Sequence, residues 1–393
     1  MGYSKHQNKR YDHIYLIKRS DSLLNLKNSF PWFSEEDKVA FLKNSKKILD
    51  SGVLISGEYT FALEKATREL TSAKYAVGLS SGTAALEIIL KYLECEDSEV
   101  LVPNNTFIST LYAIQNAKGK PILVDIDPYN FCIEIQDFIS KINKKTKAVI
   151  IVHLAGYITE HISEIKKICT ERNIFLIEDS SHAFGAKYED FIAGNIGFAS
   201  ACSFYPTKIV TGGTGGILTT NNEGLNNFAI RSRSHGSDET GANHFLSPNW
   251  YISEFNALLC YLQIKSLDMI IEKRNQIATL YSDFILSRYS NYFRIQPIHN
   301  KRVHTYYKYI VKTDLNIKES IIQYFRDRGI ALGHCYGIQL NQHPSVKHVF
   351  SETLSSSLDY ADKHFTLPCH LNISELEAQQ VINILESYLN VSV

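Results

Sequence analysis

The sequence has no excess of charge of either sign and no long hydrophobic run. Its 393 residues include 41 Lys and Arg and 41 Asp and Glu, so the formal net charge is zero. A balanced charge gives no electrostatic footprint for nucleic acid or an acidic membrane surface, and we expect neither partner. No apolar run approaches the length that spans a bilayer, and the N-terminus lacks the apolar core of a signal peptide.

Cysteines in an organised pattern are also missing. The seven cysteines are scattered, odd in number and include no C-x-x-C pair, which argues against a disulfide framework or a cysteine-ligated zinc. Asp125, His153 and His334 match no zinc spacing, so we predict no metal site. His235 and His370 are interpreted as structural or substrate-side residues. The composition is consistent with a protein of the reducing cytoplasm.

What the sequence does contain is a regular alternation of short apolar runs and helical patterns. The apolar runs are KYAVGL (74–79), EVLVP (99–103), PILVD (121–125), AVIIVH (148–153), IFLIED (174–179) and ASACSFY (199–205). Helical patterns such as TAALEIILKYL, FISTLYAIQNA and ISEIKKICTERN lie between several of them. This alternation predicts a three-layer α/β domain with a mostly parallel sheet between helices.

The length allows two domains. We predict an N-terminal arm over residues 1–33, a large α/β domain over 34–265, and a bridging helix with a smaller C-terminal α+β domain over 266–393. A long helical pattern from about Ser253 to Tyr289 would connect the two domains. The polar stretch from 231 to 251 is predicted to be a long loop.

Polar residues follow directly after the predicted strands. Parallel sheets bind ligands at the carboxyl ends of their strands, so these residues should meet at one edge. They are the SSGT turn (80–83), the NNTF turn (104–107), His153, Asp179 with His182, and Lys208.

Each of these residues has a chemical use and a plain structural alternative. The SSGT turn at a helix N-terminus suits a phosphate, or is an ordinary N-cap. Asp179 is an anionic partner, or a buried acid that caps the next turn. His182 is a donor to a phenolate, or a core histidine. Phe107 stacks on a planar ring, or belongs to the core. Lys208 is a Schiff-base nucleophile, or a solvated loop lysine.

Taken together, the first use of each residue describes one cofactor. A phosphate, a ring, an anion for a ring nitrogen and a Schiff-base lysine are the requirements of pyridoxal phosphate. An acid beside the pyridine nitrogen keeps that nitrogen protonated, so that the ring accepts electrons from the substrate carbanion.

At these residues the sequence closely resembles the DegT/DnrJ/EryC1/StrS family of sugar aminotransferases. These are fold-type-I pyridoxal-phosphate enzymes that act on nucleotide-linked keto sugars. The resemblance runs from about Ser34 to the C-terminus. It is carried by ISGEYTFALEKA, VGLSSGTAALEI, VPNNTFIST, VDIDPYNF, KTKAVIIVHLAG, IEDSSHAFGA, CSFYPTK, SPNWYISEFNALL and GHCYG, in family order.

The resemblance implies a role for each candidate residue. Lys208 would form the Schiff base and move the proton as general base. Asp179 would pair with the pyridine nitrogen, His182 would face the phenolic oxygen and Phe107 would stack on the ring. The phosphate would be held by Gly82, Thr83 and Ser203. Asn249 would reach the phosphate of the neighbouring subunit, which implies a homodimer with shared active sites.

Some positions depart from the family pattern. The usual Asn-x-Arg is Asn249-Trp250-Tyr251. The family commonly has an acidic residue in its Gly-rich loop, which here is GGTGG (212–216), and Thr214 stands at that position. The aromatic that often follows VHL is Ala155, and EDAAQAHG has become EDSSHAFG. These differences affect the substrate side more than the cofactor side.

The resemblance therefore predicts transamination of a nucleotide-diphospho-4-keto-6-deoxyhexose, linked to dTDP, GDP or UDP, with L-glutamate as the amino donor. The product would feed amino-sugar synthesis for a surface glycan such as O-antigen. The alternatives are amination at C-3 of a 3-keto sugar, a pyridoxal-phosphate-dependent sugar dehydratase, and a non-enzymatic regulatory protein that keeps the site. Family dehydratases carry histidine at the lysine position, so Lys208 argues against the second.

Overall fold

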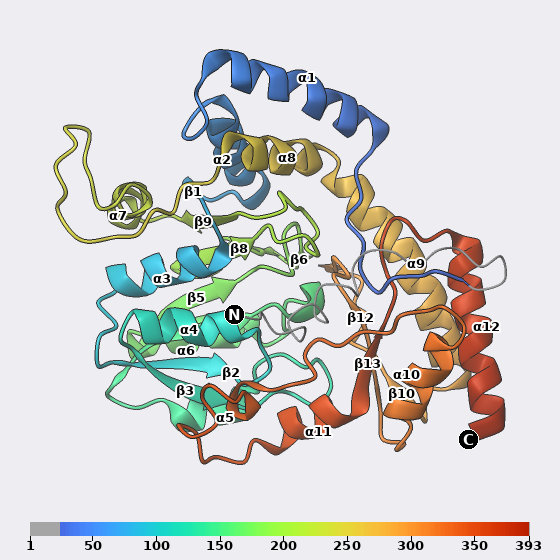
Figure 1. Cartoon of the computed structure of the whole chain (residues 1–393). Helices are drawn as coiled ribbons and strands as arrows, with labels where there is room; N and C mark the ends of the chain where they lie inside the picture. The colour runs from blue at the N-terminus through green and yellow to red at the C-terminus, as the bar shows by residue number, and fades with distance from the viewer. Residues whose placement is uncertain (1–23, 393) are drawn as a thin grey trace, which may run out of the picture.

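The computed structural model describes residues 24–392, so the predicted arm up to residue 23 lies outside the described residues. The helices are α1 (Glu35–Ser51), α2 (Glu58–Thr71), α3 (Gly82–Tyr92), α4 (Ile108–Asn116), α5 (Ile135–Lys141), α6 (Ile162–Arg172), α7 (Glu223–Arg233), α8 (Glu254–Lys265), α9 (Leu267–Arg288), α10 (Lys318–Arg326), α11 (Ser355–Lys363) and α12 (Glu375–Ser392) (Figure 1).

A seven-stranded sheet has the order β1-β9-β8-β5-β4-β2-β3. Its strands are β1 (Tyr75–Leu79), β2 (Glu99–Pro103), β3 (Lys120–Val124), β4 (Thr146–Val152), β5 (Phe175–Asp179), β8 (Ala199–Ser203) and β9 (Gly216–Thr220). All pairs are parallel except those of β9, which runs antiparallel to both β1 and β8. The prediction of a mostly parallel sheet is confirmed, and β9 is a strand that the sequence pattern did not reveal.

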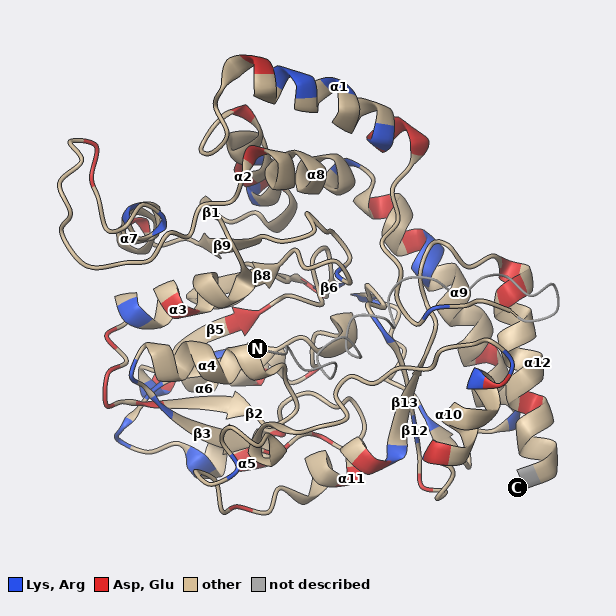
Figure 2. Ribbon diagram, in the orientation of Figure 1, with Lys and Arg blue, Asp and Glu red and all other residues tan. Residues whose placement is uncertain are grey.

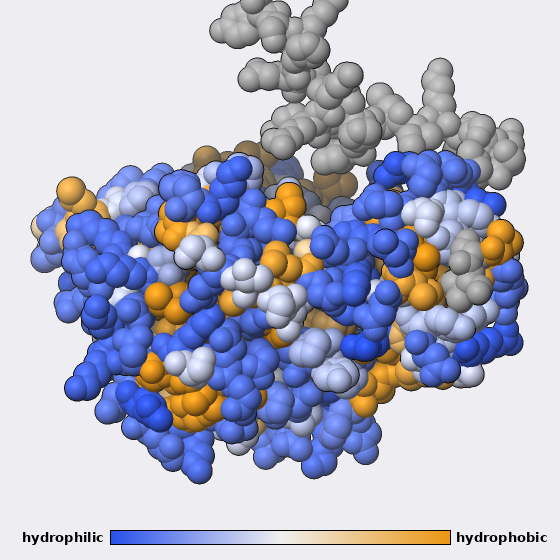
Figure 3. Space-filling view, turned by 90° about the horizontal axis from the view of Figure 1, so that it is seen from below, coloured by the Kyte–Doolittle hydropathy of each residue, from blue (hydrophilic) through white to orange (hydrophobic). Residues whose placement is uncertain are grey.

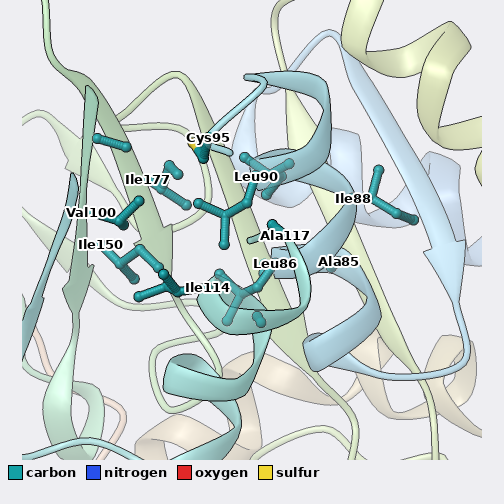
Figure 4. Packing of buried hydrophobic residues seen from close by; sticks show 14 of the residues in the cluster. Ala85, Leu86, Ile88, Leu90, Cys95, Val100, Ile114, Ala117, Ile150 and Ile177 are labelled. Carbon is teal, nitrogen blue, oxygen red and sulfur yellow. The ribbon is translucent and has the colours of Figure 1, made fainter. Parts of the chain in front are cut away.

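Helices cover both faces of this sheet. Side chains alternate across a strand, so Val100 and Val102 of β2 join the cluster under α3 and α4, whereas Leu101 joins the cluster under α5 and α6. Figure 4 shows the first cluster, where Leu86 and Leu90 of α3 meet Val100, Ile150 and Ile177 from the strands. This is the predicted three-layer arrangement.

The C-terminal part has its own core. A small antiparallel sheet of β10 (Phe293–Arg294), β12 (Tyr309–Thr313) and β13 (His364–Leu367) packs with α9, α10 and α12 (Figure 1). A third small sheet pairs β11 (Arg302–Val303) with β6 (Lys187–Tyr188), which also pairs with β7 (Phe191–Ile192). The predicted long helical region is two helices that break at Ser266.

The polar stretch after β9 is only partly the predicted loop, because α7 extends to Arg233 before the irregular segment begins. The described end of the arm also has a structure. Leu26 forms a bridge with Ile330 and its side chain joins the C-terminal core. Residues 24–31 therefore contact the C-terminal part of the chain, a location the sequence did not indicate, whereas Trp32 packs against the cluster that contains α1 and α8.

Charge is evenly spread over the outside of the molecule. Figure 2 shows acidic and basic side chains interspersed along the helices, and Figure 3 shows a mainly hydrophilic face with small separate apolar areas. Between residues 24 and 392, no helix is both long and apolar enough to cross a membrane. In the same range, no group of three or more His, Cys, Asp or Glu side chains could hold a metal ion.

Candidate active site

The carboxyl ends of β1, β2, β5 and β8 meet at a cavity of about 350 Å³. Seven of the residues predicted for the site line it: Gly82, Thr83, Phe107, Asp179, His182, Ser203 and Lys208. They come from turns far apart in the sequence, and the parallel sheet brings them together as expected. Tyr307 and Tyr336, from the C-terminal part, line the same cavity and were not predicted.

One end of the cavity is the N-terminus of α3. The Ser81 hydroxyl caps the helix by accepting the N–H of Ala84 at 3.1 Å, and the first-turn residues Gly82 and Thr83 face the cavity. The first N–H groups of a helix lack intrahelical acceptors and carry the positive end of its dipole. The turn is thus both the N-cap and a position suited to a phosphate.

Two glycines allow this turn to lie close to the sheet. A Cβ at Gly82 would come within 3.0 Å of the Ser203 Cβ, and one at Gly216 within 2.2 Å of the Ser81 carbonyl carbon. Gly216 is the last glycine of the Gly-rich loop. The loop therefore supplies the close backbone approach that places the helix N-terminus beside Ser203.

Asp179, the last residue of β5, is only 7% exposed. Its Oδ2 accepts a hydrogen bond from Thr110 Oγ1 at 3.1 Å, and its Oδ1 accepts the N–H of Ser181 at 3.1 Å. These two bonds fix the carboxyl group at the cavity wall. A buried carboxylate in this position favours a cation opposite it.

His182 is buried, and its hydrogen bonds define its tautomer. Nδ1 accepts the N–H of Ala155 at 3.3 Å, so Nε2 carries the proton and donates it to Tyr336 Oη at 3.0 Å. Burial, and then the charges of Lys208 and Lys308, hold the pKa of His182 well below its usual range. A neutral imidazole with a donor facing the cavity results.

Lys208 lies half-buried after β8, with its Nζ 4.8 Å from the centre of the Tyr307 ring. The Tyr307 hydroxyl is 2.9 Å from Thr207 Oγ1, and its ring stacks on His182 with the centroids 4.1 Å apart. Tyr307 therefore contacts two predicted site residues, His182 through its ring and Lys208 through the ammonium group of the lysine. Tyr307 lies in the irregular segment just before β12, which begins at Tyr309.

Phe107 is 53% exposed and lies at the cavity mouth with its ring 6.0 Å from that of Tyr336. It is not a core residue. An exposed aromatic side chain in this place is free to stack on a planar ligand.

Two predicted positions lie outside the cavity of their own chain. Asn249 is exposed and forms a β-bridge with Ser234. His153, which we placed at the sheet edge, points away from the cavity and pairs with the buried Glu178 at 3.0 Å. Tyr251, at the family's arginine position, lies over the guanidinium of Arg233, which binds Glu64 at 2.8 Å.

The cavity residues fit pyridoxal phosphate. A helix N-terminus without room for a Cβ at Gly82 suits the phosphate, and the fixed carboxyl group of Asp179 suits a protonated ring nitrogen. The Nε2–H of His182 suits a phenolate, and Lys208 is the amine that would bond to the aldehyde carbon.

Comparisons with known proteins identify the family and the fold. The model of the DegT/DnrJ/EryC1/StrS aminotransferase family matches residues 35–386. GDP-perosamine synthase of Vibrio cholerae is 24% identical over 351 residues, which are 87% of this chain and 94% of that protein. The structure of Helicobacter pylori PseC, an aminotransferase involved in the biosynthesis of pseudoaminic acid, superposes with a TM-score of 0.85. PseC is 24% identical, and the match covers 94% of this chain and 100% of that one.

A second solved structure is the putative sugar aminotransferase Spr1654 from Streptococcus pneumoniae in its pyridoxal-phosphate form. It has a TM-score of 0.83 and 23% identity, and the match covers 93% of this chain and 98% of that one.

Proposed function

Because the chain belongs to the DegT/DnrJ/EryC1/StrS aminotransferase family, whose sugar aminotransferases use pyridoxal phosphate, we propose that it aminates a nucleotide-diphospho-4-keto-6-deoxyhexose with L-glutamate as donor. The observation that carries this proposal is the convergence of Lys208, Asp179 and the α3 N-terminus on one cavity. The product would serve amino-sugar synthesis for a surface glycan such as O-antigen.

The cofactor supplies the electron sink, and the chain's residues supply position and proton transfer. Gly82, Thr83 and Ser203 would hold the phosphate, and Asp179 would keep the ring nitrogen protonated. His182 would face the phenolic oxygen, which would share its Nε2–H with Tyr336 Oη, while Phe107 would cover the ring. Lys208 would carry the proton between the donor's α-carbon and the cofactor as general base.

We also propose that the enzyme is a homodimer with shared active sites. Asn249 is exposed and outside its own cavity, where it is available to the phosphate of a second copy. The surface around α1 and α2 supports a partner as well, because Val39, Leu42 and Phe61 are 66%, 70% and 58% exposed. Exposed apolar side chains gathered on one region are typical of an interface.

The test has two stages. The purified protein should take up pyridoxal phosphate with a visible absorption band, and borohydride should trap the cofactor on Lys208, as mass spectrometry would show. Lys208→Ala should remove both the band and the activity. The absence of any cofactor bound at Lys208 would favour the regulatory alternative.

The second stage identifies the reaction. The loaded enzyme is incubated with glutamate and with 4-keto or 3-keto sugars carrying dTDP, GDP or UDP, and 2-oxoglutarate is measured. A 3-keto sugar as the better substrate would select the C-3 alternative. Failure to produce 2-oxoglutarate from any of them would refute the transaminase proposal, and full activity of Lys208→His would favour a dehydratase.

A further inference from the structure

Tyr307 and Lys308 are adjacent residues that reach the site from the irregular segment before β12. The N–H of Tyr307 donates to the carbonyl of Ala155 at 2.9 Å, and Ala155 in turn holds Nδ1 of His182. The Tyr307 ring stacks on His182, and its hydroxyl meets Thr207, the residue before Lys208. Tyr307 thus contacts both His182 and Thr207, the residue that precedes Lys208.

Lys308 is a second lysine beside the same ring, and unlike Lys208 it is buried. Its Nζ is 5.6 Å from the centre of the Tyr307 ring, on which Lys208 Nζ also lies at 4.8 Å. Lys308 is only 9% exposed, and its ammonium donates to Asn28 Oδ1 and Ser29 Oγ of the N-terminal segment. Two ammonium groups therefore lie against one aromatic ring.

The N-terminal segment is held firmly where it meets Lys308. Asn28 Nδ2 donates to the carbonyl of Thr366 at 2.9 Å, and Asn28 Oδ1 also accepts from Thr366 Oγ1 at 3.2 Å. The neutral oxygens of Asn28 and Ser29 hold the Lys308 ammonium without neutralising it. Its positive charge consequently remains available to act on the cavity.

We propose that Tyr307 and Lys308 are positioning residues for Lys208. The ring fixes the place of the Lys208 nitrogen, and the charge of Lys308, presented by Asn28 and Ser29, opposes a second positive charge there. An amine must be neutral to act as nucleophile or base, and a nearby like charge favours that form. The inference rests on the proposed function and adds a role for residues 28, 29, 307 and 308.

Several titratable groups line the cavity of Lys208 or interact with Lys208 electrostatically, and they change charge at different pH values. They are Asp179, His182, Cys202, Tyr205, Tyr307, Lys308, Cys335 and Tyr336. Burial raises the pKa of Cys202 and Cys335 to about 12 and lowers that of His182. Burial first, and then the charges of Arg274 and Lys208, lower the pKa of Lys308 to about 8. Lys308 is thus a neighbour whose charge changes near pH 8.

The experiment measures the visible band of the loaded protein against pH. Lys308→Met should raise the midpoint at which the nitrogen bonded to the cofactor loses its proton, by roughly 0.5 to 1 pH unit. Lys308→Arg keeps the charge and should restore the wild-type midpoint. Lys301→Met, which removes an exposed lysine paired with Glu189, is the matched control and should change nothing.

Tyr307 is tested through two substitutions. Tyr307→Phe keeps the ring and should retain most of the activity, whereas Tyr307→Leu should lower kcat at least tenfold with little change in KM. A midpoint in Lys308→Met equal to that of wild type and Lys308→Arg would overturn the role of Lys308. Equal kcat in Tyr307→Leu and Tyr307→Phe would overturn the role of the ring.

A further measurement uses the protein without bound cofactor. Lys308 is one of the charges that lower the pKa of His182, so the His182 titration of the apo protein, followed by NMR, should move upward in Lys308→Met. If Lys308→Met does not fold, Asn28→Ala should move the His182 titration and the band midpoint in the same direction by a smaller amount. No movement in Asn28→Ala would count against the proposal. A wild-type protein without a band would instead refute the proposed function.

Discussion

The cavity has two walls, and they are held in place differently. The wall from the large sheet consists of turns directly after β1, β2, β5 and β8, so neighbouring strands fix each residue there. The wall from the C-terminal part consists of Tyr307 and Tyr336 on irregular segments. These segments are held mainly by individual hydrogen bonds to residues far away in the sequence, such as the Tyr336 N–H to Asn105 Oδ1 at 3.1 Å and Thr305 Oγ1 to the His182 carbonyl at 2.7 Å.

This difference has a consequence for function. A substitution at the end of a parallel strand is accepted only if the neighbouring strands still pack around it. An irregular segment held by individual hydrogen bonds accepts substitutions more freely. We therefore expect the sheet wall to carry the chemistry common to the family and the second wall to adjust it. Substitutions on the sheet wall should cost more activity than substitutions on the second wall.

The largest effect among substitutions that keep the Schiff-base lysine is expected for Asp179→Asn. Removing one partner of a buried ion pair costs about 3–5 kcal/mol, so kcat should fall by roughly 10² to 10⁴. The measurement is single-turnover and steady-state kinetics with the keto sugar that the substrate screen selects.

The matched control is Asp125→Asn, another acid after a strand of the same sheet. Asp125 lies outside the cavity and accepts the N–H groups of Ser356 and Ser357 at 2.9 and 2.8 Å. This variant should lose about 1–3 kcal/mol of folding free energy and keep its kcat. Equal losses of kcat in both variants would break the distinction between the site acid and the structural acid.

The next largest effect is expected for Gly216, the glycine that lets the α3 N-terminus lie close to the sheet. In Gly216→Ala the new Cβ would meet backbone atoms of Ser81 and Gly82 at 2.2 and 2.4 Å, so the α3 N-terminus must shift. The dissociation constant for pyridoxal phosphate should rise by about 5- to 150-fold, since overpacking costs about 1–3 kcal/mol. Titration of the apo protein with the cofactor measures it.

Gly241→Ala provides the comparison for this variant. Gly241 has φ +83° but nothing within 4 Å of its Cβ position, so its substitution strains the backbone far from the cavity. It should lower stability by about 1 kcal/mol and leave cofactor affinity unchanged. An unchanged affinity in Gly216→Ala would show that the close approach is not needed for binding.

The two walls also differ in how far the sequence predicted them. The apolar runs ending in Asp179 and before Lys208 predicted β5 and β8, and the parallel arrangement then placed both residues at one edge. β9 was missed because GILTT contains Thr219 and Thr220. Their hydroxyls are buried but donate to the carbonyls of Gly194 and Phe198 at 2.6 and 2.8 Å, so polar residues are accommodated inside the sheet.

The second wall left no comparable pattern in the sequence. Tyr307 is one of several aromatic residues in HTYYKYIV, and its role depends on contacts with residues more than a hundred positions away, such as Ala155 and His182. Tyr336 depends likewise on Asn105. Local periodicity contains no information about such contacts, which is why the strand-end residues were found and these were not.

A third prediction concerns the acid sensitivity of the C-terminal part of the chain, which carries the second wall. His370 Nε2 donates to the carbonyl of Lys27 at 2.8 Å, and among the described residues its buried Nδ1 has no partner. Burial first, and then Arg274 and Lys308, lower the pKa of His370 to about 4. The unfolded chain binds the proton near pH 6.5, so this contribution is complete above pH 6.5 and is lost as the pH falls toward 4.

The loss over that interval is roughly 3 kcal/mol, at 1.36 kcal/mol for each pH unit. His370→Gln should therefore show a shallower decline of unfolding free energy between pH 6.5 and 4.5 than the wild type, measured by urea unfolding. His348→Gln, at an exposed position, should keep the wild-type slope. Parallel slopes for all three proteins would show that His370 is not the group that destabilises the folded protein in acid.

The smallest expected effect is that of Tyr336→Phe, and it sharpens the comparison most directly. The variant keeps the ring beside Phe107 and loses the hydroxyl that accepts from His182 Nε2 at 3.0 Å. One neutral hydrogen bond contributes about 0.5–1.5 kcal/mol, so kcat/KM should change by about two- to tenfold. Tyr112→Phe, which loses the 3.2 Å contact of an exposed hydroxyl with Ser345, should have no effect.

A loss of 10² or more in Tyr336→Phe is the size expected for a general acid or base. Tyr336 would then act in the chemistry itself, and the division between a catalytic sheet wall and an adjusting second wall would fail.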